Sequence, residues 1–424
     1  MIASNGVCYR LIATSFCSSL FCCVWLFFVE KRFAECVGDV RQVKIVGKLA
    51  SKRNDVWTKS GIFAQTSIYF GMITAKFGGT AITADNLKYV ARCAEGRKFV
   101  VVSAPGKEND FDEKATDLLE KYYFCGDENV WQRFADKCAR LAERNGVIMN
   151  VAELLERAKE RARLFSAEYC LSLGEELAAK IVAEYLGATY CEAAEVFVFQ
   201  NKAKALLNKR KTYCNLKRMA MCSNQVVLGG FYGGIDGIND RHVFGRGGGD
   251  VSGAVVAAAT GSVSYENRTD VCGVMSADPR LVSKANTIRS LSYEQMRKLA
   301  LAGAKVLHKD AVLPMEKCGA PIVVCSWAAP NGASTLVGNC PCRAKVLSVA
   351  ERQKCGKSVC SVFHNMSHAE VSARLCRLFG GGLSSRSGVD KVVLDNNLLE
   401  IVSDRSILRP VFEAFCSDGE ADSI

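Results

Sequence analysis

The chain has 424 residues, of which 49% are hydrophobic and 23% are charged, and its formal net charge is +11. This length suffices for two or three domains, and the composition is that of a folded globular protein rather than a disordered or fibrous one. The positive charge suits anionic ligands such as nucleotides, but the basic residues are scattered, which argues against a nucleic-acid-binding protein. The 4 histidines argue against a histidine-based metal site.

The 21 cysteines are irregularly placed and include no repeated CxxC pair at zinc-finger spacing. A chain of this length builds its own core and does not need disulfides. We therefore expect most of the cysteines to be small buried apolar residues in a protein of the reducing cytoplasm.

The first 71 residues differ in character from the rest of the chain. Leu11–Val29 is strongly apolar, with Arg10 before it and Lys31-Arg32 after it. Its length is borderline for a membrane span and also suits the core of a signal peptide. Two interpretations stay open: a real anchor, or a translated upstream leader ahead of a natural start at Met72. We favour the leader and expect a cytoplasmic protein without membrane association.

From Met72 onward, segments typical of strands alternate with segments typical of helices. Continuous apolar runs such as KFVVVS are typical of strands buried on both faces of a parallel sheet. The alternation predicts an α/β fold with a parallel sheet between helices, and with binding loops at the carboxyl ends of the strands. The predicted strands are Met72–Phe77, Lys98–Ser103, Val226–Phe231, Ser262–Tyr265 and Ile322–Ser326. The predicted helices are Asp85–Cys93, Lys114–Tyr122, Val130–Arg144, Val151–Phe165, Leu173–Tyr185, Tyr293–Ala302 and Asp310–Cys318, the last interrupted near Pro314.

The composition changes after about Thr335, and Gly338–Arg343 is typical of a linker. The remaining residues predict a small α/β module of a kind common in ligand sensing. Its predicted elements are a strand at Ser358–His364, a helix at Ser367–Leu378, a glycine/serine loop at Gly380–Gly388, paired strands at Val389–Leu394 and Leu398–Val402, and a helix at Asp404–Cys416.

The stretch Val243–Ala259 begins as a glycine-rich loop around Arg246 and places Asp250 at the start of an alanine-rich run. Glycines let backbone N–H groups approach a ligand, and a helix N-terminus favours an anion. Arg246 adds a guanidinium fork suited to a carboxylate or a phosphate. A surface loop ahead of a core helix explains these residues equally well.

Polar residues also lie at other predicted strand ends. Lys76 precedes Gly78 and Gly79, where its ammonium could reach a phosphoryl group. Ser103 ends the second strand, and Thr116 begins a helix. For Lys76 taken alone, a surface lysine before a turn is the more typical interpretation.

Three further segments have two interpretations each. Ser172 and Glu175 fit a capping box, which needs no ligand, or Glu175 faces a ligand ammonium. Arg268–Arg280 is a turn-rich stretch that could hold a nucleotide base and ribose or be a plain connection. Lys305 ends a helix, where it complements the helix dipole or reaches a triphosphate.

The chain contains no P-loop, no protein-kinase HRD/DFG set and no GxSxG elbow. It does carry lysines, a glycine/arginine loop and an aspartate in strand-end loops. Phosphoryl transfer needs little else from a protein: cations on the moving group, Mg²⁺ between the phosphates and an acceptor held in line.

Seven motifs occur in the order seen in aspartokinases, which belong to the amino-acid kinase family, and the chain resembles them over about residues 72–340. The motifs are KFGGTA (Lys76–Ala81), VVSAPGK (Val101–Lys107), KATDLL (Lys114–Leu119), SLGEELAAK (Ser172–Lys180), GRGGGD (Gly245–Asp250), ENRTDVCGVMSADPR (Glu266–Arg280) and LSYEQMRKLALAGAKVLH (Leu291–His308). The resemblance implies a three-layer α-β-α amino-acid kinase fold with a mostly parallel sheet. It also implies ATP-dependent phosphorylation of the side-chain carboxylate of L-aspartate to 4-phospho-L-aspartate, the first step toward diaminopimelate, lysine, threonine and methionine. The alternatives are a family member acting on glutamate, acetylglutamate or UMP, and a catalytically silent ligand-binding sensor.

The resemblance assigns roles to individual residues. Lys76 and Asp250 would serve phosphoryl transfer, Arg246 would bind the substrate carboxylate, and Glu175 would bind its ammonium. Lining residues of the aspartate site would be Ser103 and Thr116. The residues that would bind ATP, which carries Mg²⁺, are Lys76, Gly78, Gly79, Thr269, Asp270, Met275, Arg280 and Lys305. No residue is assigned as a metal ligand.

Three positions depart from the family pattern. Gly249 replaces the usual serine of GRGGSD, Ala81 replaces the usual serine of KFGGTS, and Met275 stands where an aromatic residue often packs near the nucleotide. None of these changes removes a charged group, so we expect activity to be kept with weaker nucleotide affinity.

The resemblance predicts three regions: an atypical N-terminal extension at 1–71, a catalytic domain at 72–337 and an ACT-like regulatory region at 344–424. Aspartokinases commonly carry two ACT modules, whereas the C-terminal residues here suffice for a single or truncated one. We expect a homodimer or higher homo-oligomer whose reduced module senses an effector such as lysine weakly.

Overall fold

The computed structural model divides the chain into two compact units, Met1–Lys59 and Ser60–Ile424. It describes residues 71–416 except Ser223, Lys305, Asn396 and 380–388, together with four short strands in the first unit.

Those four strands form two antiparallel pairs. The strand β1 (Ala3–Ser4) pairs with β2 (Val7–Cys8), and β3 (Leu11–Ile12) pairs with β4 (Phe28–Val29). Most of the apolar run Leu11–Val29 therefore lies outside the described residues. Within the part of the chain that is described, no helix combines the length and the apolar character needed to cross a membrane.

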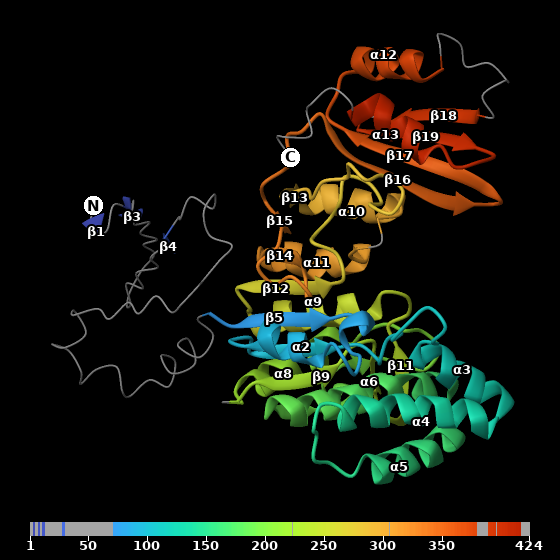
Figure 1. Ribbon diagram of the computed structural model, residues 1–424. Coiled ribbons are helices and arrows are strands. Elements are labelled where there is room, and N and C mark those ends of the chain that lie inside the picture. The colour runs from blue at the N-terminus through green and yellow to red at the C-terminus, as the bar shows by residue number, and fades with distance from the viewer. Residues whose placement is uncertain are drawn as a thin grey trace. The chain divides into compact units, whose positions relative to one another are not determined.

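The second unit is built on an eight-stranded sheet with the order β13-β15-β14-β12-β5-β6-β9-β7 (Figure 1). Neighbouring strands are parallel throughout except for β14 and β15. The predicted mostly parallel sheet is thereby confirmed. Its strands are β5 (Ile73–Phe77), β6 (Phe99–Val102), β7 (Thr189–Cys191), β9 (Val226–Gly229), β12 (Ser264–Thr269), β13 (Ser290–Ser292), β14 (Ile322–Ser326) and β15 (Ser334–Gly338).

Helices cover both faces of this sheet, and the strand β6 shows why. Val100 and Val102 pack in the cluster formed with α2–α6, whereas Phe99 and Val101 pack in the cluster formed with α7–α9. Because successive strand side chains point to opposite faces, an apolar run such as FVVV requires a helical layer on each side. The three-layer α/β arrangement is confirmed. The helices are α2 (Leu87–Ala94), α3 (Ala115–Cys125), α4 (Glu128–Glu143), α5 (Val151–Leu164), α6 (Ala167–Leu186), α7 (Ala193–Val196), α8 (Lys209–Ala220), α9 (Gly248–Thr260), α10 (Tyr293–Ala302) and α11 (Lys309–Cys318), with a 3-10 turn η3 (Gly79–Ala81) after β5.

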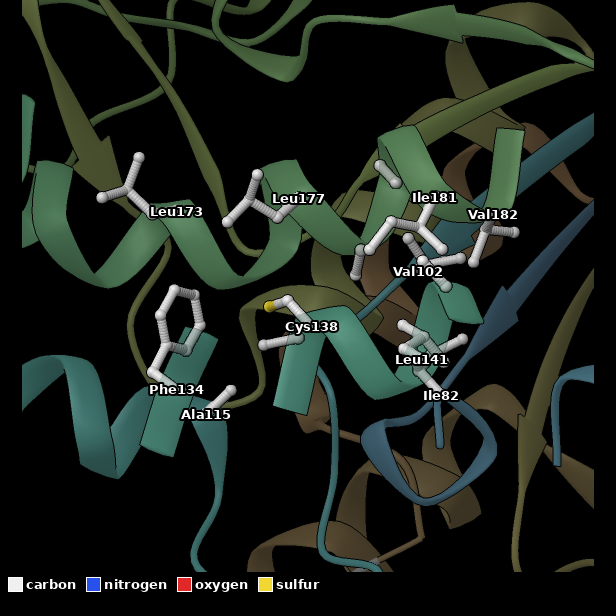
Figure 2. Close-up of a cluster of buried hydrophobic side chains, with 14 of the residues drawn as sticks. Ile82, Val102, Ala115, Phe134, Cys138, Leu141, Leu173, Leu177, Ile181 and Val182 are labelled. Carbon is white, nitrogen blue, oxygen red and sulfur yellow. The ribbon is translucent and has the colours of Figure 1, made fainter. Parts of the chain in front are cut away.

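The core between α4 and α6 is drawn in Figure 2. Leu173, Leu177 and Ile181 form a stripe along α6, and Phe134 and Cys138 of α4 lie opposite. All five side chains are buried to 1% exposure or less. Burial of each large aliphatic or aromatic side chain contributes roughly 1.5–3 kcal/mol, so this stripe fixes α6 against its neighbours.

Two predicted helices differ in the structure, and α7 and α8 were not predicted at all. The helix α6 begins at Ala167 and is capped by Ser166, whose side chain accepts from the Tyr169 N–H at 3.2 Å. Ser172 therefore lies inside the helix, and the capping-box interpretation of Ser172 and Glu175 is wrong. The helix α11 runs through Pro314 without the predicted interruption. Proline removes only one helical hydrogen bond, and the buried face of α11 packs in the core, which outweighs that loss.

A separate three-stranded sheet has the order β11-β10-β8, and its strand β10 follows β9 of the central sheet along the chain. Its strands β8 (Val198–Phe199), β10 (Tyr232–Ile235) and β11 (Ile238–Val243) were not predicted, because they are short and carry glycine or charged residues. The turn between β9 and β10 holds Phe231 in the left-handed region with φ 71°.

The C-terminal module is a four-stranded antiparallel sheet with the order β16-β17-β19-β18 and two helices. Its first strand was missed by the prediction, and the loop predicted at Gly380–Gly388 lies outside the described residues. No strand follows the last helix within the residues described, which end at Cys416. The elements are β16 (Val346–Lys354), β17 (Lys357–His364), α12 (His368–Phe379), β18 (Val389–Asp395), β19 (Leu398–Ser403) and α13 (Leu408–Cys416).

The cysteines are less buried than expected. The described cysteines are all free, and as many of them are exposed as are buried. The expectation that most are buried apolar residues is therefore wrong for this part of the chain. The buried ones are Cys93, Cys138, Cys170, Cys325, Cys342 and Cys360, and the exposed ones are Cys125, Cys214, Cys318, Cys340, Cys355 and Cys376.

Candidate active site

The parallel strands end at one edge of the sheet, where their loops meet. The Gly78 N–H donates to the carbonyl of Arg268 at 3.2 Å, and the Ser103 N–H donates to that of Phe77 at 3.2 Å. These hydrogen bonds continue the pairing of β5 with β12 and of β5 with β6 past the last strand residues. The three loops that follow these strands are therefore adjacent. In open α/β sheets, ligands bind outside the carboxyl ends of the strands, where such loops meet.

Lys76 and Asp250 meet at this edge. Nζ of Lys76, in β5, donates to Oδ1 of Asp250 at 2.7 Å, and the two side chains are 11% and 16% exposed. Asp250 is the third residue of α9, where the helix dipole favours a negative charge. Its second oxygen, Oδ2, accepts the backbone N–H of His308 at 3.0 Å. The carboxylate is thus held by two partners and keeps the lysine ammonium in place.

The glycine loop leads into α9 two residues earlier than predicted, since the helix begins at Gly248. Gly247 caps it with φ 75°, and a Cβ at this position would lie 2.4 Å from Cγ of His308. Only glycine therefore fits here. A Cβ at Gly249 would lie 3.3 Å from Cε of Lys76 and 3.3 Å from Oγ of Ser103. Gly249, one of the three residues that depart from the family pattern, thus lies between Lys76 and Ser103.

Glu175 is buried at the same edge. Its side chain is 4% exposed, and its Oε2 has no hydrogen-bond partner among the described residues. Burial raises the pKa of this carboxyl to about 8, although the Ala104 N–H hydrogen bonds to it. Ala104 directly follows Ser103, so one short loop approaches the lysine pair on one side and Glu175 on the other. A buried carboxylate with a free oxygen suits a cationic ligand.

A charged network lies directly behind Glu175. Arg241 of β11 donates to Oγ of Ser172 at 2.8 Å and pairs with Glu176 at 2.8 Å. Its guanidinium lies between two aromatic rings, 4.3 Å from the centroid of Tyr169 and 4.7 Å from that of Tyr232. Burial alone would raise the pKa of the Glu176 carboxyl, but Arg241 and two other cations lower it. The turn of α6 that carries Glu175 is therefore fixed on both sides of that residue.

The other predicted substrate residues are less constrained. Ser103 lies in the loop between the two sides of the site. Thr116 is the second residue of α3 and is half-buried, and its hydroxyl has no partner among the described residues. Arg246 is exposed in the loop before α9 and makes no ion pair within the described part of the chain. Both side chains are free to meet a ligand.

The residues predicted to bind the nucleotide lie at the carboxyl ends of β5 and β12 and in the loops that follow these strands. Gly78 and Gly79 follow β5, and a Cβ on Gly78 would lie 3.8 Å from Nζ of Lys76. Thr269 ends β12, and its Oγ1 donates to the exposed Asp270 at 2.9 Å. The long loop after β12 contains the half-buried Met275, whose sulfur accepts from the Thr287 hydroxyl at 3.4 Å, and Arg280, which pairs with Asp278 at 2.7 Å and is 82% exposed. Lys305 lies outside the described residues.

Sequence reasoning missed residues that act through tertiary contacts. His308 was quoted only as the end of a motif, although it contacts both Gly247 and Asp250. Arg241 carried no local signal, because it is one charged residue in a mixed segment. Glu176, adjacent to Glu175 in SLGEE, was the available signal, since two successive glutamates inside a largely apolar helix require buried partners.

Comparison with known proteins gives matches over this region and beyond. The model of the amino acid kinase family matches residues 72–326. Aspartokinase 3 of Bacillus subtilis is 31% identical over 291 residues, covering 63% of this chain and 63% of that protein. The aspartokinase of Chlamydia trachomatis is 29% identical over 269 residues, covering 60% of this chain and 61% of its own. The chain thus spans less than two thirds of these curated relatives.

Solved structures match over a longer part of the chain. The aspartate kinase of Clostridium acetobutylicum is 26% identical and has a TM-score of 0.62, with 82% of each chain covered. Aspartokinase III of E. coli, solved with aspartate and ADP, is 22% identical with a TM-score of 0.60, covering 81% of this chain and 84% of its own. The second likeness is one of fold alone.

Proposed function

The chain belongs to the amino acid kinase family, and on that premise we propose that it is an aspartate kinase, which transfers the γ-phosphoryl group of ATP to the side-chain carboxylate of L-aspartate. The proposed catalytic domain is 72–337. The sequence motifs and the aspartokinase relatives support this substrate, and the geometry at the strand-end edge supports the chemistry.

One observation carries the choice of acceptor: Glu175 is a buried carboxyl with an unpartnered oxygen. An amino-acid acceptor brings an ammonium that would pair with it. UMP has no ammonium, and acetylglutamate has its amine blocked as an amide. The residue therefore favours a free amino acid over these two alternatives. A silent ligand-binding sensor would keep the same carboxyl, so the argument against that alternative is the Lys76–Asp250 pair, which phosphoryl transfer needs and binding alone does not.

The reaction needs little covalent chemistry from the protein. An ionised side-chain carboxylate is already a nucleophile, so one of its oxygens attacks the γ-phosphorus, the bond to the ADP oxygen breaks, and no general base is required. Lys76, held by Asp250, offsets the charge on the moving phosphoryl group. Arg246 would pair with the α-carboxylate, which leaves the side-chain carboxylate to react. Ser103 and Thr116 would complete the acceptor site.

The nucleotide would enter as MgATP, with Mg²⁺ carried between its phosphates. Gly78 and Gly79 lack side chains beside Lys76 and would let backbone N–H groups approach the phosphates. The remaining proposed ATP-binding residues follow β12 and α10: Thr269, Asp270, Met275, Arg280 and Lys305.

The proposal is tested with the full-length protein in a coupled assay of ADP release. L-Aspartate, L-glutamate, N-acetyl-L-glutamate and UMP are compared as acceptors, with an acceptor-free control. We expect turnover with L-aspartate only. N-Acetyl-L-aspartate keeps both carboxylates but lacks the ammonium, so it should be a poor acceptor. Turnover with UMP but not with aspartate would assign another family activity, and none with any acceptor would refute an enzyme.

We further propose that the region at 344–424 forms a single reduced regulatory module. One four-stranded sheet and two helices are described there. L-Lysine or L-threonine at millimolar concentration should therefore change the rate of ADP release by less than about twofold, a coupling free energy below the 1–3 kcal/mol typical of allosteric enzymes. Strong inhibition by either amino acid would contradict this.

A further inference from the structure

Lys137 is a buried amine that the proposed reaction does not use. It lies on α4, and its side chain is 2% exposed. Nζ donates to the carbonyl oxygen of Gly106 at 2.8 Å and forms an ion pair with Asp112. Burial alone would raise the pKa of the Asp112 carboxyl, but hydrogen bonds from Lys137 and from the Glu108 N–H hold it below its usual range. Both partners belong to the loop segment that links β6 to α3.

Stability alone does not account for a lysine at this position. Lys137 lies beside Cys138 on a helix whose neighbouring turns, at Phe134 and Leu141, are packed in the apolar core. Removing an ammonium from water costs several kcal/mol, and replacing a buried ion pair by apolar side chains of similar volume is often neutral or stabilising. Uncharged residues at both 137 and 112 would fill the same space without this cost, so the pair and its hydrogen bond to Gly106 have another reason.

Gly106 lies against the loop that follows Lys76. A Cβ on Gly106 would lie 2.2 Å from the carbonyl oxygen of Gly79, so the two backbones are in direct contact. The Gly106 N–H donates to the carbonyl of Ile82 at 3.1 Å, which adds a second tie to the same turn. Any shift of Gly106 is therefore transmitted to Gly79.

The same short segment also reaches the other side of the site. Ala104, two residues before Gly106, hydrogen bonds through its N–H to the carboxyl of Glu175. A Cβ on Gly174 would lie 2.8 Å from Cβ of Ala104, so this contact leaves no room for movement toward α6. The segment 104–106 therefore contacts both Gly79, in the proposed phosphate-binding loop, and Glu175, the proposed ammonium-binding carboxylate. Lys137 holds this segment through its hydrogen bond to the Gly106 carbonyl.

We propose that Lys137 is a positioning residue for phosphoryl transfer: by holding the Gly106 carbonyl, it fixes the loop that sets Gly79 and Glu175 relative to one another. This inference rests on the proposed function, because only a reaction between two bound groups needs that spacing. A misplacement of about 1 Å at a reacting centre costs about 100-fold in rate, so a remote hydrogen bond of this kind has a large effect.

The kinetic test uses the full-length chain with Lys137→Met, Lys137→Arg and the double variant Lys137→Met/Asp112→Asn. We expect Lys137→Met to lower kcat for aspartate by about 10- to 100-fold. Lys137→Arg keeps the donors and should recover part of that loss. In the double variant the unpaired Asp112 charge is gone, so its thermal midpoint should return toward that of the wild type while kcat stays low. Lys159→Met, which removes a lysine paired with Glu128 on the neighbouring helix, is the matched control and should leave kcat unchanged.

A second test measures the mobility of the loop and does not depend on activity. Hydrogen–deuterium exchange of the peptides covering 78–82 and 103–107 should be faster in Lys137→Met and in the double variant than in the wild type and in Lys159→Met. Normal kcat in a double variant that folds, or unchanged exchange in both peptides, would overturn the positioning role. If the wild type itself released no ADP with aspartate, the proposed function would fail, and the exchange result would still decide whether Lys137 holds the loop.

Discussion

Replacing Lys76 with methionine should lower kcat for aspartate by about 100- to 1,000-fold, the usual effect of removing one preorganised donor from a transition state. Methionine keeps the apolar stem in β5 but removes the ammonium that Asp250 holds at 2.7 Å. In the proposed reaction, the charge that develops on the transferred phosphoryl group would then lose the cation that Lys76 supplies. Steady-state assays of ADP release at saturating ATP measure this loss directly.

The fold of the Lys76→Met variant should remain intact. Asp250 keeps the hydrogen bond from the His308 N–H, and its carboxylate is partly exposed, so it is not left as a buried unpaired charge. The matched control is Lys217→Met, which changes an exposed lysine of α8 away from the strand-end loops. Near-normal kcat in a folded Lys76→Met protein would refute the role assigned to Lys76.

Glu175→Gln should raise KM for aspartate by about 10- to 100-fold, because hydrogen bonds to charged groups contribute about 1.5–3 kcal/mol. Burial raises the pKa of the free carboxyl to about 8. In the wild type, kcat/KM for aspartate should therefore rise with pH until about pH 8, as the carboxylate that pairs with the ammonium forms. The variant should lack this dependence, and Glu184→Gln, at an exposed position of the same helix, should keep it.

The same substitution should make the free protein more stable. The pKa of Glu175 is higher in the folded state than the ordinary value, so folding favours the protonated form. Below the pKa that this carboxyl has in the unfolded chain, the wild type keeps its full stability. As the pH rises from that value to the pKa in the folded protein, the free energy of unfolding decreases. The stability advantage of Glu175→Gln over the wild type should thus grow between about pH 4.5 and pH 8 to a few kcal/mol. A constant difference in the free energy of unfolding across this range would contradict the raised pKa.

The sequence predicted the central strands where both faces are apolar. It missed β7, β13 and β15, which lack a continuous buried apolar run, and the part of β12 where charges are buried. FVVV in β6 can only be a doubly covered strand. The strand β12, in contrast, continues past Tyr265 through Glu266 and Arg268, which were not expected in a buried strand. They are tolerated because Arg268 pairs with Glu266 at 2.8 Å and Arg97 adds a second cation at 2.9 Å. A pairing of this kind depends on neighbours in space and leaves no local pattern.

The candidate site likewise contains residues that the sequence predicted and residues that it did not. Lys76, Glu175 and Asp250 were predicted from the aspartokinase motifs, and the structure places Lys76 beside Asp250 and buries Glu175. The residues that hold them were not found. His308 is 58 residues from Asp250, and Lys137 is 31 residues from Gly106. Such contacts exist only after the strands have brought the loops together, so periodicity and spacing cannot reveal them.

A phosphoryl group on the side-chain carboxylate of aspartate makes an acyl phosphate, so chemical trapping of the product tests the proposed reaction most directly. Acyl phosphates react with hydroxylamine, so full-length protein incubated with MgATP, L-aspartate and hydroxylamine should yield the aspartyl 4-hydroxamate, identified by mass spectrometry. We predict hydroxamate in amounts equal to the ADP released, and about 100-fold less or lower with Lys76→Met. ADP release without hydroxamate would contradict transfer to the side-chain carboxylate of aspartate, and equal hydroxamate from the Lys76→Met protein would contradict the role proposed for Lys76.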